Sequence, residues 1–317
     1  MLTKKSKIFL AGHNGMIGSA ILKLLNKKKF NNIITKERKE LDLTNQDKVF
    51  KFLKKVKPEA TIIAAAKVGG IKANNDQKGE FIYQNLAIQN NLIHGSYLCG
   101  TKNLIFLGSS CVYPKNSKQP IKESYLLSNY LEKTNEPYAI AKISGIKMCE
   151  SYNSQYNLNY KCLMPANSYG LNDNYDLNTS HFLPALIRKI LDAVKNNQDY
   201  IILWGTGKPL RELVFSEDVA DAVLFFLKKK TKETLINVGS NTEKTIDDYA
   251  KLLMKILGVN LRIKHIKKKL DGTHRKKLDN SIALKYKWKA STSIKKGLSI
   301  TVNDYLKYFL LTKRKSH

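Results

Sequence analysis

The chain has 317 residues, 43% of them hydrophobic, which is enough to bury a large core in one domain or two. No apolar run reaches the ~18 residues of a membrane helix and the first residues do not read as a signal peptide, so a cytoplasmic protein with no membrane partner is expected. The formal net charge of +29 is carried mostly by lysines at expected helix ends and loops, which indicates a solvated surface and no nucleic-acid partner.

Short β-like runs alternate with helix-length segments through the first half of the chain. Strands that are apolar almost throughout, and that alternate with helices, are typical of a parallel sheet covered on both faces. The sequence therefore predicts an α/β fold with a doubly wound (Rossmann) parallel sheet, in which ligands bind at the carboxyl ends of the strands. Strands are expected at 7–12, 32–35, 60–66, 103–110 and 158–167, and helices at 17–28, 45–56, 78–98 and 137–156.

The alternation loosens after residue 167. We predict a dinucleotide-binding domain at 1–167 plus about 212–242, and a smaller substrate-binding lobe at about 168–211 plus 243–317. No low-complexity linker separates them, so the two are expected to pack together. In this half a polar loop is expected at 171–180, helices at 181–196, 216–229 and 245–257, and strands at 201–207, 235–240 and 261–266, before a basic tail.

A glycine-rich turn follows the first predicted strand and opens the first predicted helix. Glycines there let the backbone approach a pyrophosphate, and the helix N-terminus offers aligned N–H donors. A plain strand-to-helix turn is the alternative, and the position of this turn favours dinucleotide binding. The residues expected to contact the cofactor are Gly12, Asn14, Gly15, Met16, Ile17 and Gly18.

Two cations stand near the end of the second predicted strand, where an acidic residue would bind the ribose of NAD. Arg38, with help from Lys36, can instead hold a 2′-phosphate through its guanidinium group. A chance surface cation is the alternative in so basic a chain. The sequence therefore favours NADP (NADPH) as the cofactor.

The motif Tyr138-Ala-Ile-Ala-Lys142 places a phenol and an ammonium one helical turn apart. We expect the lysine to lower the pKa of the tyrosine, which would then pass a proton to a carbonyl oxygen as hydride reaches the carbon. Ser109 ends the fourth predicted strand at the same edge of the sheet and can bind the same oxygen. These three residues are the predicted reductase site, and the tyrosine and lysine are also expected to contact the cofactor.

Cys111 and His181 are further candidates for proton transfer, because both are expected beside that carbonyl-binding site. The alternatives are a small buried side chain for Cys111 and an ordinary first helical residue for His181. The four cysteines show neither a CxxC pair nor a spacing typical of metal ligands. Reduced thiols in the cytoplasm are therefore expected, and no metal.

Eight stretches of the chain resemble the GDP-L-fucose synthase family, which belongs to the extended short-chain dehydrogenases/reductases. The most specific are KVGGI, SSCVYP, NTSHFLPAL and WGTGKPLRE, and the resemblance extends from residue 7 to about 290. It implies 3,5-epimerisation and NADPH-dependent 4-reduction of GDP-4-keto-6-deoxy-D-mannose to GDP-L-fucose. The stretches are 11–21, 64–75, 106–115, 136–150, 165–189, 203–220, 236–240 and 271–279.

The resemblance also implies roles for individual residues. Cys111 would be the base and His181 the acid of the epimerisation. Asn14 stands where the family commonly has a basic residue, which removes one phosphate contact. The family is homodimeric through helices equivalent to about 80–98 and 139–156, so a homodimer is expected. Substrate contacts are implied for Asn167, Lys189, Trp204, Arg211 and Lys276.

Two other function classes remain open. A nucleotide-sugar 4-epimerase or dehydratase of the same superfamily would hold NAD tightly and would usually lack the Cys/His pair. A non-enzymatic dinucleotide sensor could bind nucleic acid through its positive surface, but such proteins tend to lose the catalytic tyrosine or lysine. Retained NAD after purification would indicate the first class, and a salt-dependent gel shift the second.

Overall fold

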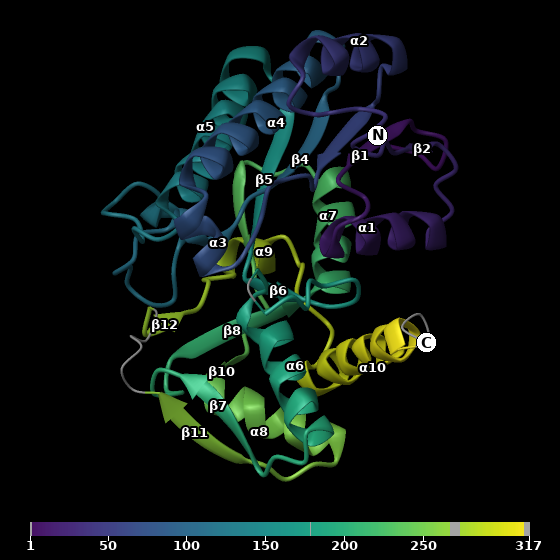
Figure 1. Cartoon of the computed structure of the whole chain (residues 1–317). Helices are drawn as coiled ribbons and strands as arrows, with labels where there is room; N and C mark the ends of the chain where they lie inside the picture. Colours follow the sequence, from purple (N-terminus) through teal and green to yellow (C-terminus); the bar gives the residue numbers. More distant parts are fainter. Residues whose placement is uncertain (1, 178, 267–272, 314–317) are drawn as a thin grey trace.

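A six-stranded parallel sheet forms the centre of the larger part of the molecule (Figure 1). The computed structural model describes residues 2–177, 179–266 and 273–313. In order across the sheet, the strands are β2 (Ile33–Ile34), β1 (Ile8–Ala11), β3 (Ala60–Ile63), β4 (Asn103–Leu107), β5 (Asn159–Pro165) and β9 (Leu235–Val238). Because β2 and β3 lie on opposite sides of β1, the winding reverses there and leaves a crevice at the carboxyl ends of the strands. The predicted doubly wound fold is confirmed.

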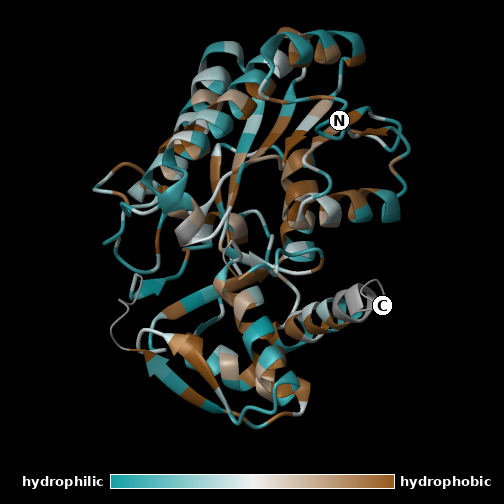
Figure 2. Cartoon of the chain, viewed as in Figure 1, coloured by the Kyte–Doolittle hydropathy of each residue, from teal (hydrophilic) through white to brown (hydrophobic). Residues whose placement is uncertain are grey.

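Helices form a layer on each face of this sheet (Figure 1). One layer pairs α1 (Met16–Lys27) with α7 (Ser216–Lys228), and the other joins α2 (Gln46–Val56), α4 (Lys78–Leu98) and α5 (Glu136–Tyr156). Figure 2 shows much of the central sheet in brown, and Ile8, Ile62 and Ile105 are fully buried in it. Burial on both faces explains why the strands are apolar almost throughout.

The smaller part of the molecule lies beyond the carboxyl edge of the sheet (Figure 1). Its central strand is β8 (Leu210–Phe215), which pairs with β6 (Asn167–Tyr169), β10 (Glu243–Thr245) and β12 (Arg275–Lys276). A separate parallel pair joins β7 (Tyr200–Trp204) to β11 (Arg262–Ile266). β6, β7, β8 and β11 share a second hydrophobic core with α6 (Phe182–Lys195), α8 (Ile246–Leu257) and α10 (Ile294–Lys313). The two separate cores support the predicted division into two lobes, which stays a prediction.

Several elements differ from the expectation. The strand expected at 60–66 ends at Ile63, and the next residues form a loop. The sequence did not indicate β8, α10, the short helices α3 (Ile71–Asp76) and α9 (Ser281–Lys285), or the 3-10 turns η1 (Ser110–Val112) and η2 (Glu123–Tyr125). Leu278, Ala283 and Trp288 pack in the first core, although they fall in the range predicted for the smaller lobe.

Some residues of the quoted motifs lie outside the described part of the chain. They are residue 178 of the NTSHFLPAL stretch, residues 271 and 272 of the last stretch, the lysines at 267–269 and the tail at 314–317. Among the described helices, none combines the length and the apolar character that crossing a bilayer requires.

Candidate active site

A cleft of about 660 Å³ opens at the carboxyl edge of the sheet. The turn after β1 and the segments after β2, β3, β4 and β5 all contribute to its lining, as the doubly wound topology predicts. The cleft therefore collects residues that are far apart in the sequence. The predicted site residues that line it are Gly12, Asn14, Gly15, Met16, Ile17, Gly18, Lys36, Arg38, Ser109, Tyr138, Asn167 and His181.

The three glycines of the turn after β1 are required for different reasons. Gly12 has φ +86°, and a Cβ there would lie 2.5 Å from the Ala65 nitrogen. A Cβ on Gly18 would lie 1.9 Å from the Gly12 carbonyl oxygen. Gly15 has φ −76°, and its Cβ would meet only that oxygen among the described residues, at 3.7 Å. The protein itself thus has room for a side chain at Gly15, on the surface that a ligand would approach.

The first turn of α1 suits a diphosphate. Gly15 is the N-cap, and in the described structure no side chain caps the helix, so the amides of Met16 and Ile17 have no intrahelical acceptor. The first turn carries no acidic residue. Exposed N–H groups and the positive end of the helix dipole attract anions there. Together with the open surface at Gly15, these donors fit the pyrophosphate of a dinucleotide.

Arg38 and Lys36 both line the cleft, but their surroundings differ. Lys36 Nζ lies 2.6 Å from a Glu40 carboxylate oxygen, and this hydrogen bond is the main cause that lowers the pKa of Glu40. Lys36 is therefore engaged in a surface ion pair that a ligand would have to replace. Arg38 is exposed at the cleft and is the better placed of the two for a 2′-phosphate.

Tyr138 and Lys142 lie one turn apart on α5, which begins with Glu136 and has Pro137 in its first turn. Lys142 is 3% exposed. Its Nζ donates a hydrogen bond to the Leu107 carbonyl oxygen (2.8 Å) and lies 5.9 Å from the centre of the Tyr138 ring. The lysine therefore ties α5 to the end of β4, directly below the tyrosine that faces the cleft.

The expectation that Lys142 lowers the pKa of Tyr138 was wrong for this structure. Burial raises the pKa of Tyr138 above its ordinary value, with Cys111 adding to the shift. Burial also lowers the pKa of Lys142 to about 8. The reason is that the ammonium is directed at a backbone carbonyl while the phenol loses water. A protonated phenol is the form that can donate to an alkoxide during a reduction.

Cys111 lies in the 3-10 turn that follows β4. Its backbone N–H donates to Ser109 Oγ (3.4 Å), and its side chain is 7% exposed and not among the described residues that line the cleft. Burial raises the pKa of the Cys111 thiol, while Lys276, Ser109 and Lys142 act in the opposite direction. Three neighbours thus favour the thiolate, and burial opposes it.

His181 is the N-cap of α6 and faces the cleft. Loss of water around the imidazole lowers the pKa of His181, and the positive charge of Lys276 contributes to the same shift. Lys276, in β12, also interacts electrostatically with Cys111 and Arg211, and burial lowers its own pKa. One ammonium therefore acts on both residues predicted to transfer protons.

The remaining predicted substrate contacts lie on the smaller part of the molecule. Lys189 Nζ donates to the Ile202 carbonyl oxygen (3.0 Å) and lies 5.3 Å from the centre of the Trp204 ring. Trp204 is 61% exposed. Arg211 donates to the Thr273 carbonyl oxygen (2.7 Å). Of the five, Asn167 lines the cleft, and the other four are not among its described lining residues.

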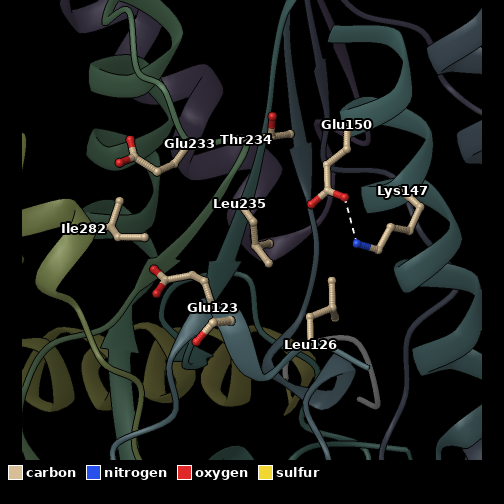
Figure 3. Close-up of a pocket in the computed structure, with 9 residues that line it drawn as sticks. Glu123, Leu126, Lys147, Glu150, Glu233, Thr234, Leu235 and Ile282 are labelled. Carbon is tan, nitrogen blue, oxygen red and sulfur yellow. Dashed lines mark hydrogen bonds and ion pairs between the residues drawn. The ribbon is translucent and has the colours of Figure 1, made fainter. Parts of the chain in front are cut away.

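A second cavity, of about 350 Å³, lies between η2, α5 and β9 (Figure 3). Its lining includes Glu123, Glu150 and Glu233, with Lys147 paired to Glu150 at 2.8 Å. Excess negative charge disfavours a phosphate-bearing ligand there. None of the predicted site residues lines this cavity.

The prediction missed the contribution of the loop after β3. Ala64, Ala65, Ala66, Lys67 and Val68 line the cleft. They were assigned partly to a strand because the run of alanines continues its apolar character. The signal that could have found them is the KVGGI motif together with the rule that ligands bind at the carboxyl ends of strands.

Comparison with known proteins agrees with this geometry. Residues 8–239 match the model of the NAD dependent epimerase/dehydratase family. The chain is similar to GDP-L-fucose synthase 1 of Arabidopsis thaliana, with 46% identity over 97% of this chain and 95% of the relative. The match covers nearly the full length of both chains.

Two solved structures share the fold closely. A GDP-6-OMe-4-keto-L-xylo-heptose reductase from Campylobacter jejuni has a TM-score of 0.89 and 34% identity over 97% of this chain and 99% of that chain. A GDP-L-fucose synthetase from Naegleria fowleri bound to NADP has a TM-score of 0.88 and 26% identity, with 98% and 97% of the two chains covered.

Proposed function

The chain belongs to the NAD dependent epimerase/dehydratase family, and we propose that it converts GDP-4-keto-6-deoxy-D-mannose to GDP-L-fucose by 3,5-epimerisation and NADPH-dependent 4-reduction. The observation that carries this proposal is the arrangement around one cleft. Ser109, Tyr138 and His181 line it, while Cys111 interacts electrostatically with the tyrosine and with a lysine that also acts on His181. A simple reductase would not need the thiol and the imidazole.

The cofactor would lie along the carboxyl edge of the sheet. The amides at the start of α1 would hold the diphosphate, and Arg38 the 2′-phosphate. NADPH, when bound, supplies the hydride for C4. The N. fowleri synthetase, whose structure contains NADP, supports this choice over NAD. In this chain the backbone at Gly15 to Gly18 and the side chain of Arg38 would make these contacts, because Asn14 brings no charge to the turn.

Epimerisation depends on the acidity of the carbons beside a ketone. Hydrogen bonds from Ser109 and Tyr138 to the C4 oxygen would stabilise the enolate that forms when a proton leaves C3 or C5. Cys111 would take that proton as thiolate, and His181 would return one from the other face of the sugar ring. The lowered pKa of His181 makes its imidazolium a stronger acid.

Reduction would use the same oxygen. As hydride reaches C4, Tyr138 would donate its phenolic proton to the developing alkoxide. The raised pKa of Tyr138 keeps that proton in place at neutral pH. Lys142 would hold α5, and with it the tyrosine, in place through the hydrogen bond from its buried ammonium to the Leu107 carbonyl oxygen.

We propose that the smaller lobe holds the nucleotide part of the substrate. Lys189, Arg211 and Lys276 would neutralise the diphosphate, and Trp204 would contact the base through its ring. Asn167 would hydrogen-bond the sugar from the end of β5 and β6.

A second candidate is a 4-reductase without epimerase activity. Burial raises the pKa of the Cys111 thiol, which disfavours the thiolate that a base requires, and a heptose reductase is among the similar structures. Lys276, the neighbour that opposes this shift most, also acts on His181, and this shared influence on the thiol and the imidazole favours the bifunctional enzyme.

One experiment separates these functions. The purified protein is mixed with GDP-4-keto-6-deoxy-D-mannose and NADPH in D2O, NADPH oxidation is followed by absorbance, and the product is analysed by NMR. GDP-L-fucose carrying deuterium at C3 and C5 is the expected product. A 6-deoxy sugar that retains the D configuration at C5 would establish the reductase alone, and no oxidation would contradict both candidates.

We also propose a cytoplasmic homodimer. All four cysteines are described, and they are free thiols. α4 and α5 expose Tyr83 (67%), Leu98 (58%), Ile140 (41%) and Tyr156 (37%). Exposed apolar side chains on adjacent helices are typical of a subunit interface.

Light scattering after gel filtration tests the dimer. Tyr83→Glu combined with Ile140→Lys should give a monomer. Val194→Glu, which alters an exposed apolar residue on α6 (40% exposed), should leave the dimer intact. A wild-type monomer at micromolar concentration would contradict the proposal.

A further inference from the structure

The loop after β3 lies between the dinucleotide turn and the segment that carries His181. We name residues 64–70 the bridging segment. At its first end, the Ala64 amide donates to the Ala11 carbonyl oxygen (3.0 Å), and the Ala65 backbone contacts Gly12 so closely that no Cβ would fit there. At its last end, the Gly70 amide donates to the Thr179 carbonyl oxygen (2.8 Å). The bridging segment thus contacts the dinucleotide turn at one end and the residues just before His181 at the other.

The middle of the bridging segment is held by a buried side chain of α4. Asn85 is 1% exposed. Its Oδ1 accepts from the Lys67 amide (3.0 Å), and its Nδ2 donates to the Lys67 carbonyl oxygen (3.0 Å) and to the Phe81 carbonyl oxygen (2.7 Å). The side-chain amide of Asn85 therefore holds both the N–H and the carbonyl group of Lys67, as a neighbouring β-strand would.

A second asparagine holds the C-terminal end of the bridging segment. Asn74, on α3, is 6% exposed, and its Nδ2 donates to the carbonyl oxygens of Gly69 (2.7 Å) and Gly70 (3.1 Å). A Cβ on Gly70 would lie 2.7 Å from the Ser180 carbonyl oxygen. The contact between the bridging segment and the residues just before His181 therefore tolerates little displacement.

We propose that Asn85 and Asn74 are positioning residues, which hold the bridging segment so that it fixes His181 relative to the dinucleotide turn. The proposal rests on the proposed function, because it concerns the proton transfers assigned to His181. Neither asparagine touches the reacting atoms. Their effect passes through backbone hydrogen bonds, from Asn85 to Lys67, along the segment to Gly70, and on to Thr179.

This arrangement explains three features that the mechanism leaves unused. A buried asparagine costs free energy unless its hydrogen bonds are made, and the backbone of Lys67 supplies two of them. Two successive glycines, Gly69 and Gly70, follow Val68, and the second allows the close approach to Ser180. Lys67 itself lines the cleft, with its ammonium 5.3 Å from the centre of the Phe81 ring, which makes a T-shaped contact with the Tyr138 ring.

Asn85→Ala is the principal test, and amide hydrogen exchange is the first measurement. Loss of the clamp should increase exchange in peptides covering 64–70 and also in peptides covering 179–185. NADPH affinity, measured by fluorescence titration, should fall by about 3- to 10-fold. Deuterium incorporation at C3 and C5 should fall about tenfold more than hydride transfer to C4, because misplaced proton donors slow only the steps that use them.

Asn85→Asp and Asn74→Ala are the independent variants. The aspartate keeps the acceptor for the Lys67 amide but sets a carboxylate oxygen against the carbonyl oxygens of Lys67 and Phe81, so its effect should be at least as large as that of alanine. Asn74→Ala should loosen 179–185 even with Asn85 in place. Either variant also decides the question if Asn85→Ala fails to fold.

Asn153→Ala is the matched control. Asn153 makes the same reciprocal clamp on the backbone of Tyr160, accepting from its amide (2.8 Å) and donating to its carbonyl oxygen (2.7 Å), away from the cleft. It should lower the melting temperature and leave the ratio of deuterium incorporation to hydride transfer unchanged.

Two results would overturn the proposal. One is increased exchange at 64–70 with unchanged exchange at 179–185, which would show that the bridging segment does not hold the residues before His181. The other is an equal loss of epimerisation and reduction in Asn85→Ala, as a general loss of folded enzyme would give. If wild-type enzyme makes no product, the proposed function fails, and the exchange data alone still decide whether the bridge exists.

Discussion

Replacing two glycines of the same turn by alanine should give opposite phenotypes. At Gly15 the backbone is extended and the new methyl group would meet only the Gly12 oxygen, at 3.7 Å among the described residues, so folding should be unchanged or stabilised by up to about 1 kcal/mol. The methyl group would instead stand where a diphosphate approaches α1. Losing one charge-assisted hydrogen bond costs about 1.5–3 kcal/mol, which corresponds to roughly 10- to 100-fold in the Kd for NADPH.

At Gly18 the new methyl group would lie 1.9 Å from the Gly12 carbonyl oxygen, which α1 and β1 hold in place. Overpacking of this kind costs about 1–3 kcal/mol or more, and the melting temperature should fall accordingly. The assays are thermal unfolding by circular dichroism without cofactor and NADPH titration by fluorescence. A Gly15→Ala protein that binds NADPH as tightly as wild type would refute the assignment of this turn to the diphosphate.

Four further predictions concern the chemistry. Tyr138→Phe should lower the rate of NADPH oxidation by about 10²- to 10⁴-fold with little change in NADPH affinity, and a smaller loss would indicate another proton donor. Cys111→Ser should suppress deuterium incorporation at C3 and C5 while reduction persists; normal product stereochemistry would remove the thiol from its role. Arg38→Ala should weaken NADPH binding much more than NADH binding, and an equal loss would defeat the assignment. Burial lowers the pKa of Lys142 to about 8, so its charge is lost as the pH rises through that value, and kcat/KM for reduction should fall above it. Between pH 8 and about 10.5 the unfolded chain binds more protons at this lysine than the folded chain does, so the contribution of Lys142 to the free energy of unfolding should rise with pH. Lys142→Met should abolish both pH dependences.

Elements with strong local patterns were predictable. α2 illustrates why, because Asn45 caps it by accepting from the Lys48 amide (3.0 Å) and Lys57 ends it in the left-handed region. β8 lacked such a pattern, since its run contains Glu212. That carboxylate is fully buried and accepts from the amides of Leu278 (2.8 Å) and Asn241 (2.7 Å), partners that no local reading of the sequence could supply.

The candidate site divides in the same way. The residues of the glycine turn and Tyr138 were found because each stands in a motif whose spacing reflects its chemistry. The direction in which the pKa of Tyr138 shifts was not predicted correctly, because it depends on burial and on the hydrogen bond that turns Lys142 toward Leu107. Asn85 was missed as well, since its partner Lys67 belongs to a loop that the alanine run concealed.

The position of β9 has a consequence for synthesis on the ribosome. β9 covers the outer edge of β5, yet it follows β5 by about 70 residues, which take about 4–14 s to translate. During that interval the nascent sheet ends in a long, apolar strand with unpaired backbone groups, a template for association between neighbouring chains. Chains truncated before residue 235 should therefore aggregate, and chaperones that shield extended apolar segments should matter most while residues 166–234 are being translated.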